Sequence, residues 1–154
     1  SNPTEGLMYK KILVPTDGSR LSDRAVKEAT LLAQALAAKI VLFHAFAATE
    51  QAIYSEGSSA LLVSRQRARK AAASRARRVL AAAEKKIGAA GVAVRKDYAV
   101  AASPHDGIVA AAQKHRCDLI VMASHGRRGL SRFLLGSETQ AVVSRASVPV
   151  LVVR

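Results

Sequence analysis

Short apolar runs alternate with longer amphipathic segments along this chain, and this alternation constrains the fold more than any other feature. Five runs are rich in Val, Ile and Leu and too short for helices: residues 10–14, 40–46, 92–100, 118–122 and 148–153. Strands separated by helices pair in parallel, because each crossover helix returns the chain to the same end of the sheet. The sequence therefore predicts an α/β fold, a single domain with an open, parallel five-stranded sheet and helices on both faces.

Four helices are expected between these runs. Apolar residues recur every three or four positions after Ser22, which we expect to cap the first helix. The second and longest helix is expected to end at the glycine-containing residues 88–91. Ser103 followed by Pro104 is a typical helix start, and residues 137–145 predict the last helix. The third apolar run is more polar than the others, which favours a strand at the edge of the sheet.

The composition fits such a domain and excludes several classes of protein. Half of the 154 residues are hydrophobic, only 4% are aromatic, and 31 are alanine, so close helix packing is favoured over an aromatic-rich barrel. The single cysteine, Cys117, excludes a disulfide framework and fits a reducing cytoplasm. No apolar run reaches the ~18 residues of a membrane span. We interpret residues 1–8 as a tag remnant or leader and residues 9–154 as the domain.

The charge is strongly basic and unevenly distributed. The formal net charge is +13, and residues 65–86 contain nine Lys or Arg against one Glu. This excess indicates either an anionic partner or one solvated basic helix, and the second interpretation is favoured. The segment has no interleaved aromatic residues, so it would hold nucleic acid by its phosphates without reading the bases.

Two segments at strand ends carry the chemistry. Residues 15–19 (PTDGS) follow the first strand, and residues 122–139 follow the fourth. In an open parallel sheet, ligands bind beyond the carboxyl ends of the strands, where the strand order reverses. Glycines allow a ligand to approach the backbone, and free amides at a helix start bind phosphate oxygens. Three arginines in the second segment add positive charge, and Ser137 and Thr139 add hydroxyl donors, so the segment predicts an anion-binding loop suited to a polyphosphate.

Four stretches of the chain together resemble a known family. They occur in the order KILVPTDGS, VLFHA, DLIVMASHGRRG and LLGSETQAVVSRASVPVLVV, while neither a P-loop nor a G-x-G-x-x-G motif is present. Over residues 9–154 the chain resembles a universal stress protein of the ATP-binding type. The pattern of those members is G-x2-G-x9-G-[ST]; Gly126, Gly136 and Ser137 match it, and Ala123 replaces the first glycine.

This resemblance implies a Rossmann-like fold of the adenine nucleotide alpha hydrolase type, and a role in stress response. It implies ATP as the ligand, with Mg²⁺ carried by the phosphates, since the sequence contains no carboxylate cage. The implied adenine and ribose contacts are Pro15, Thr16, Asp17, Ala45 and Met122. The implied phosphate contacts are Gly126, Gly136, Ser137 and Thr139, with Ala123 in the glycine slot, Glu138 through its backbone, and Arg127 among the nearby arginines.

Simpler interpretations stand beside several of these assignments. Asp17 can organise its turn by hydrogen-bonding backbone amides, and Ser137 can be a helix cap. His125 can either donate to a phosphate or stand in solvent, whereas His44 fits a hydrogen-bonded core position. Cys117 fits a packing role better than that of a nucleophile.

Three functional hypotheses follow from the sequence. The leading one is a cytoplasmic nucleotide-binding stress protein with weak ATP hydrolysis at most, since no residue is a general base positioned for attack. The second is a family member that binds no nucleotide and acts through protein partners, for which Ala123 is the only support. The third is nonspecific nucleic-acid binding through residues 65–86, which is disfavoured. A homodimer through residues 148–153 is also expected, because an uncharged edge strand promotes association.

Overall fold

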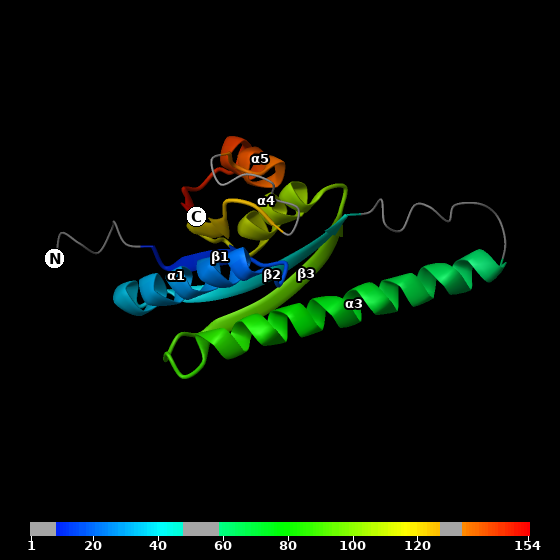
Figure 1. Ribbon diagram of the computed structural model, residues 1–154, viewed down its shortest axis with the longest axis horizontal. Helices are drawn as coiled ribbons and strands as arrows, with labels where there is room; N and C mark the ends of the chain where they lie inside the picture. The colour runs from blue at the N-terminus through cyan, green and yellow to red at the C-terminus, as the bar shows by residue number, and fades with distance from the viewer. Residues whose placement is uncertain (1–8, 48–58, 127–133) are drawn as a thin grey trace.

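The structure is a computed structural model that describes residues 9–47, 59–126 and 134–154 (Figure 1). The predictions for residues 1–8 and for Arg127 lie outside the described residues. Within the described part, strands and helices alternate as predicted, in the order β1 (Lys11–Pro15), α1 (Arg20–Leu36), β2 (Lys39–Ala47), α3 (Ser59–Ile87), β3 (Val94–Ala101), α4 (Pro104–Lys114), β4 (Leu119–Ala123), α5 (Ser137–Arg145) and β5 (Val150–Val153). Each strand begins within two residues of its predicted start.

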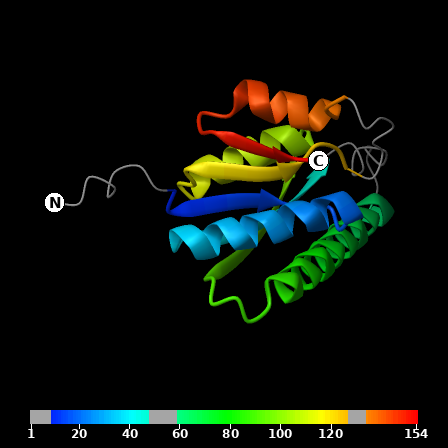
Figure 2. The ribbon, with the colours of Figure 1, turned by 60° about the vertical axis from the view of Figure 1, so that its left-hand side comes forward.

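The five strands form one parallel sheet with the order β3-β2-β1-β4-β5. Figure 2 shows β5 beside β4 at one side of the sheet, and β3 is the strand at the other end. This confirms the predicted α/β class, and it confirms that the polar third strand is an edge. The strand order reverses at β1, because the chain continues from β1 to β2 on one side and places β4 on the other.

Alternate residues of the strands face two separate hydrophobic cores. On one face Ile12 and Leu42 pack with α1 and α3, and on the other Leu13 and Phe43 pack with α4 and α5. This alternation follows from the period of two in a strand. The helices contribute small residues to both cores, as the alanine content predicted.

The start of α1 differs from the prediction. Ser19, not Ser22, is the N-cap, and its Oγ accepts the Ser22 amide at 3.2 Å. Gly18 has φ +78°, so the chain turns just ahead of Ser19 and enters the helix one turn earlier than expected. Ser22 is instead buried in the first turn, where its Oγ donates to the Ser19 carbonyl at 2.9 Å and lies 3.1 Å from Thr16 Oγ1.

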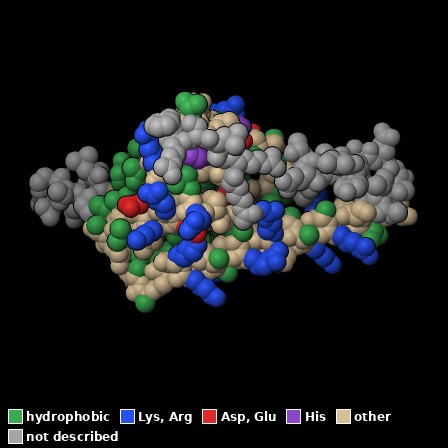
Figure 3. All heavy atoms as spheres, in the orientation of Figure 1, with side chains coloured by type: hydrophobic (Ala, Val, Ile, Leu, Met, Phe, Trp, Pro, Cys, Tyr) green, Lys and Arg blue, Asp and Glu red, His purple; other side chains and the backbone are tan. Residues whose placement is uncertain are grey.

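Helix α3 extends beyond the sheet, as Figure 1 shows. Its last half packs through Ala76, Leu80 and Ala83, whereas Arg65 and Arg69 near its start are exposed. Figure 3 shows Lys and Arg side chains spread along this helix. No helix in the described part of the chain is both long and apolar enough to cross a membrane.

A half-buried carboxylate joins β3 to the end of α4. Asp97 Oδ2 accepts hydrogen bonds from Lys114 Nζ at 2.8 Å and from His115 Nε2 at 2.7 Å, and Oδ1 accepts the Tyr98 amide at 2.9 Å. Burial raises the pKa of Asp97, but the hydrogen bonds from Lys114, His115 and the Tyr98 amide together hold this pKa below its ordinary value. The carboxylate therefore stabilises the folded state.

Replacing Asp97 by Asn should lower the free energy of unfolding at pH 7 by about 1–3 kcal/mol, because the charged acceptor is lost. Since the pKa in the folded state lies below the unfolded value, this contribution is complete above about pH 4 and is lost as the pH falls through the folded value. Urea unfolding of both proteins at pH 7 and at several values below pH 4 would measure the difference in their free energies of unfolding. If this difference is the same at every pH, the stabilisation does not come from the charge of Asp97.

Candidate functional site

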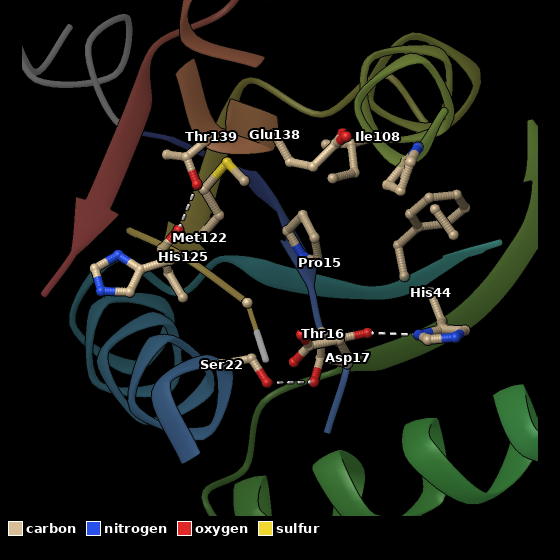
Figure 4. Close-up of a pocket in the computed structure, with 15 residues that line it drawn as sticks. Pro15, Thr16, Asp17, Ser22, His44, Ile108, Met122, His125, Glu138 and Thr139 are labelled. Carbon is tan, nitrogen blue, oxygen red and sulfur yellow. Dashed lines mark hydrogen bonds between the residues drawn. The ribbon is translucent and has the colours of Figure 1, made fainter. Parts of the chain in front are cut away.

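A cavity of about 200 Å³ opens at the carboxyl ends of β1 and β4, where the strand order reverses. Figure 4 shows side chains from both strand ends and from α5 directed toward it. Nine of the twelve predicted site residues line this cavity: Pro15, Thr16, Asp17, Ala45, Met122, Ala123, Gly126, Glu138 and Thr139. Gly136 and Ser137 lie at the adjoining start of α5 and do not line it. Arg127 lies outside the described residues.

Hydrogen bonds fix the turn after β1. The buried Thr16 places its Oγ1 3.1 Å from Ser22 Oγ, and its carbonyl accepts from His44 Nδ1 at 2.7 Å (Figure 4). A carbonyl can only accept, so His44 Nδ1 carries a proton. His44 is buried and also contacts Phe46 edge-on, which confirms its predicted place as a hydrogen-bonded core residue.

Asp17 both shapes the turn and faces the second segment. Its Oδ1 accepts the Ser19 amide at 2.9 Å, which confirms the predicted role in the turn. Its Oδ2 lies where Gly126 approaches: a Cβ on Gly126 would be 2.7 Å from that oxygen. A side chain at position 126 would displace the Asp17 carboxylate, so the glycine lets this carboxylate keep its place beside the segment after β4.

Ala123, which replaces the first glycine of the family pattern, is accommodated without strain. It is the last residue of β4, and among the described residues only Ala37 and Arg116 have positive φ without being glycine. Its carbonyl accepts a hydrogen bond of 2.9 Å from Thr139 Oγ1. The left-handed conformation that would require glycine is absent at this position, so the methyl group costs nothing in the backbone.

Gly136 lets the start of α5 contact the end of β4. Its amide donates to the Ser124 carbonyl at 2.7 Å, and a Cβ on it would lie 3.2 Å from atoms of Ser124 and His125. Gly136 is the N-cap of α5 and provides no side-chain hydrogen bond, so the proposal that Ser137 caps this helix is wrong. Ser137 is the first helical residue, and its amide belongs to the first turn, whose amides have no acceptor within the helix.

The opposite rim joins α4 to α5. Glu138 Oε2 accepts from the backbone amide of His105 at 2.7 Å and lies 2.7 Å from His105 Nδ1. Arg145 donates to Asp106 at 2.9 Å, and a hydrogen bond from Ser103 lowers the pKa of that Asp106 carboxyl. Glu138 therefore joins α5 to the start of α4 through its Oε2.

Several lining residues were not predicted as site residues, namely Ser22, Phe43, His44, Pro104, Ile108 and His125. Phe43 could have been found, because it lies two positions before Ala45 and so shares its face of β2. Ile108 and Pro104 reach the cavity only because α4 packs over β2, a long-range contact that no local pattern encodes.

Cys117 has no part in this site. It is buried before β4, and burial raises the pKa of its thiol to about 11. The thiol therefore stays protonated at neutral pH, which confirms a packing role. Within the described residues no group of three or more His, Cys, Asp and Glu side chains could hold a metal ion.

Comparison with known proteins identifies the family. The pattern of the universal stress protein family matches residues 8–154. The chain belongs to this family. Universal stress protein MJ0577 of Methanocaldococcus jannaschii is 31% identical over an alignment of 159 positions that covers 96% of each chain. The solved structure of MJ0577 matches this fold with a TM-score of 0.82.

Two further universal stress protein structures share the fold. The universal stress protein UspA of Lactobacillus plantarum has a TM-score of 0.80 and 25% identity, covering 96% of this chain and 99% of its own. A universal stress protein solved in complex with cAMP has a TM-score of 0.65 and 26% identity, covering 96% and 98%. At least one relative with this fold therefore binds an adenine nucleotide.

Proposed function

We propose that this universal stress protein binds ATP in the cavity at the ends of β1 and β4 and acts in stress response. The observation that carries this proposal is the cavity itself, which is lined jointly by the turn after β1 and by the segment after β4. Its walls include the apolar side chains of Ala45, Met122 and Ile108, which suit the faces of an adenine ring. The relative solved with cAMP supports an adenine nucleotide as the ligand.

The phosphates are proposed to extend toward the start of α5. A helix start with a glycine N-cap offers backbone amides and the positive end of the helix dipole to an anion. His125 lines the cavity, and within the described residues its buried Nδ1 has no hydrogen-bond partner, which fits a donor to a phosphate oxygen. These features fit a nucleotide whose phosphates point away from β2.

Mg²⁺ is proposed to arrive with the phosphates, which supply the oxygen ligands that this ion prefers. Hydrolysis is expected to be weak at most, because Asp17 and Glu138 are the only carboxylates among the described residues of the cavity wall, and both are engaged in hydrogen bonds. The chain is proposed to act in the cytoplasm, where a lone cysteine such as Cys117 stays reduced.

The affinity should fall from ATP to ADP to AMP if amides at α5 and nearby positive charge recognise the phosphates. Each phosphate removed takes away charge-assisted hydrogen bonds, so a loss of about tenfold per phosphate is expected. Calorimetric titration of nucleotide-free protein with the three nucleotides measures this order. Equal affinities for the three nucleotides would mean that the protein recognises the nucleoside and not the phosphates. No heat at millimolar ATP would favour the alternative in which the protein binds no nucleotide and acts through protein partners.

The basic helix α3 is proposed to have no part in nucleotide binding. Replacing Arg77, Arg78 and Lys85 together by Gln should leave the fold and ATP affinity unchanged, because all three side chains are exposed and none lines the cavity. Nonspecific DNA binding should weaken, and the slope of log affinity against log salt should flatten by about 0.9 for each DNA phosphate that the variant no longer neutralises. Fluorescence anisotropy with a DNA duplex measures this slope; a drop in ATP affinity would contradict the placement of α3.

A homodimer through β5 is also proposed. This strand is at the edge of the sheet, contains no charged residue and exposes Leu151. An unpaired edge strand of this kind is a template on which a second chain can pair.

A further inference from the structure

A second and wider cavity, of about 370 Å³, lies at the amino ends of the strands, away from the proposed ATP cavity. Lys11, Lys39 and Arg95 belong to β1, β2 and β3, and the strand register pairs Lys11 with Lys39 and Val41 with Arg95. By alternation these three share a sheet face with Leu13 and Val41, which pack beneath α4. Helix α4 ends at Lys114, and Lys114, His115 and Arg116 at this end also line the cavity.

The lining of this cavity, which we name the basic basin, is strongly cationic. It contains five Lys or Arg side chains and no acidic residue among those described: Lys11, Lys39, Arg95, Lys114 and Arg116. Two of them are engaged, because Lys11 Nζ donates to the His115 carbonyl at 3.0 Å and Lys114 pairs with Asp97. The other three make no ion pair or hydrogen bond through their side chains with any residue that the structure describes.

The position of Arg116 is informative. It follows the end of α4 with φ +53°, a left-handed conformation in which glycine or asparagine is usual. The Arg116 and Cys117 amides donate to the Gln113 and Ala112 carbonyls at 3.1 and 2.9 Å, so the backbone is held there firmly. An arginine at such a position adds a third unpaired cation to one cavity, where glycine would be less strained.

We propose that the basic basin binds a free, multiply charged phosphate anion, such as a chain of two or three phosphates. Three unpaired cations, Lys39 of β2, Arg95 of β3 and Arg116 after α4, line the same cavity. Together they carry more positive charge than a single monoanion can balance. The volume lies within the range of small-molecule pockets. The basin is separate from the ATP cavity, since Lys11 and Pro15 stand at opposite ends of β1, four residues or about 13 Å apart. This proposal does not depend on ATP binding.

The test is calorimetric titration with tripolyphosphate at low salt. The wild type is compared with Lys39→Gln/Arg95→Gln and with a matched control, Arg77→Gln/Arg78→Gln on α3, which removes the same charge elsewhere. We expect the basin variant to lose one tripolyphosphate site per chain or to bind there about tenfold more weakly. The control should bind as the wild type does, and all three should bind ATP equally.

A third variant separates binding from folding. Arg116→Gly removes a basin cation and relieves the left-handed strain, so its thermal unfolding temperature should equal or exceed that of the wild type while tripolyphosphate binds more weakly. Equal weakening in the α3 control would show that the anion responds only to net charge and would overturn the proposal. Unchanged binding in both basin variants, or no binding to the wild type, would overturn it as well.

Discussion

Replacing Gly136 by Asp should abolish ATP binding, with a loss of roughly 100-fold or more in affinity. A Cβ at this position lies 3.2 Å from three atoms of Ser124 and His125, so the contact between β4 and α5 must open. An Asp at an N-cap also accepts the first-turn amides itself. It would therefore occupy the donors that we assign to the phosphates and would repel them by its charge.

Two matched variants separate these causes. Gly136→Ala adds the same Cβ without charge, and it should weaken ATP binding less than the Asp variant does. Ala123→Gly restores the glycine of the family pattern, and it should preserve affinity because Ala123 has no positive φ to relieve. Calorimetry gives the affinities, and circular dichroism with thermal unfolding shows that each variant is folded. If the Gly136→Asp protein is folded and binds ATP normally, the start of α5 does not bind the phosphates.

The order of elements could be predicted from the sequence because each strand and helix is encoded by a local pattern. Continuous apolar runs indicated β1, β2 and β4, which are covered on both faces, and Ser103-Pro104 placed the start of α4 correctly. The start of α1 could not be placed this way. Ser19 and Ser22 are both acceptable caps, and the choice depends on the turn at Gly18 and on the hydrogen bond between the Ser22 and Thr16 hydroxyls.

The site residues at the ends of β1 and β4 could be predicted from the sequence, whereas those that α4 contributes by packing across the sheet could not. The parallel order brings the residues after β1 and β4 together, and Asp17 and Gly126 do lie against each other. The basic basin shows the limit of sequence patterns most clearly. Its cations are spread from Lys11 to Arg116 and gather only because three strands are paired in register and α4 ends above them.

The protein should sediment as a dimer of about twice 16.3 kDa at micromolar concentration, and Leu151→Lys should convert it to a monomer. In the proposed dimer β5 pairs with its own copy across a two-fold axis, which brings Leu151, 44% exposed in the single chain, into the interface. A lysine there would place two like charges together in a position that the dimer removes from water. Lysines on edge strands commonly prevent such pairing.

Val100→Lys is the matched control, because Val100 is a comparably exposed apolar residue, 47% exposed, on the other edge strand, β3. If β5 forms the interface, the Val100 variant stays dimeric while the Leu151 variant dissociates, and both keep the same net charge. The reverse result would assign dimerisation to β3. A wild-type boundary at 16.3 kDa would eliminate the dimer and would mean that the four residues of β5 are too few to hold two chains together.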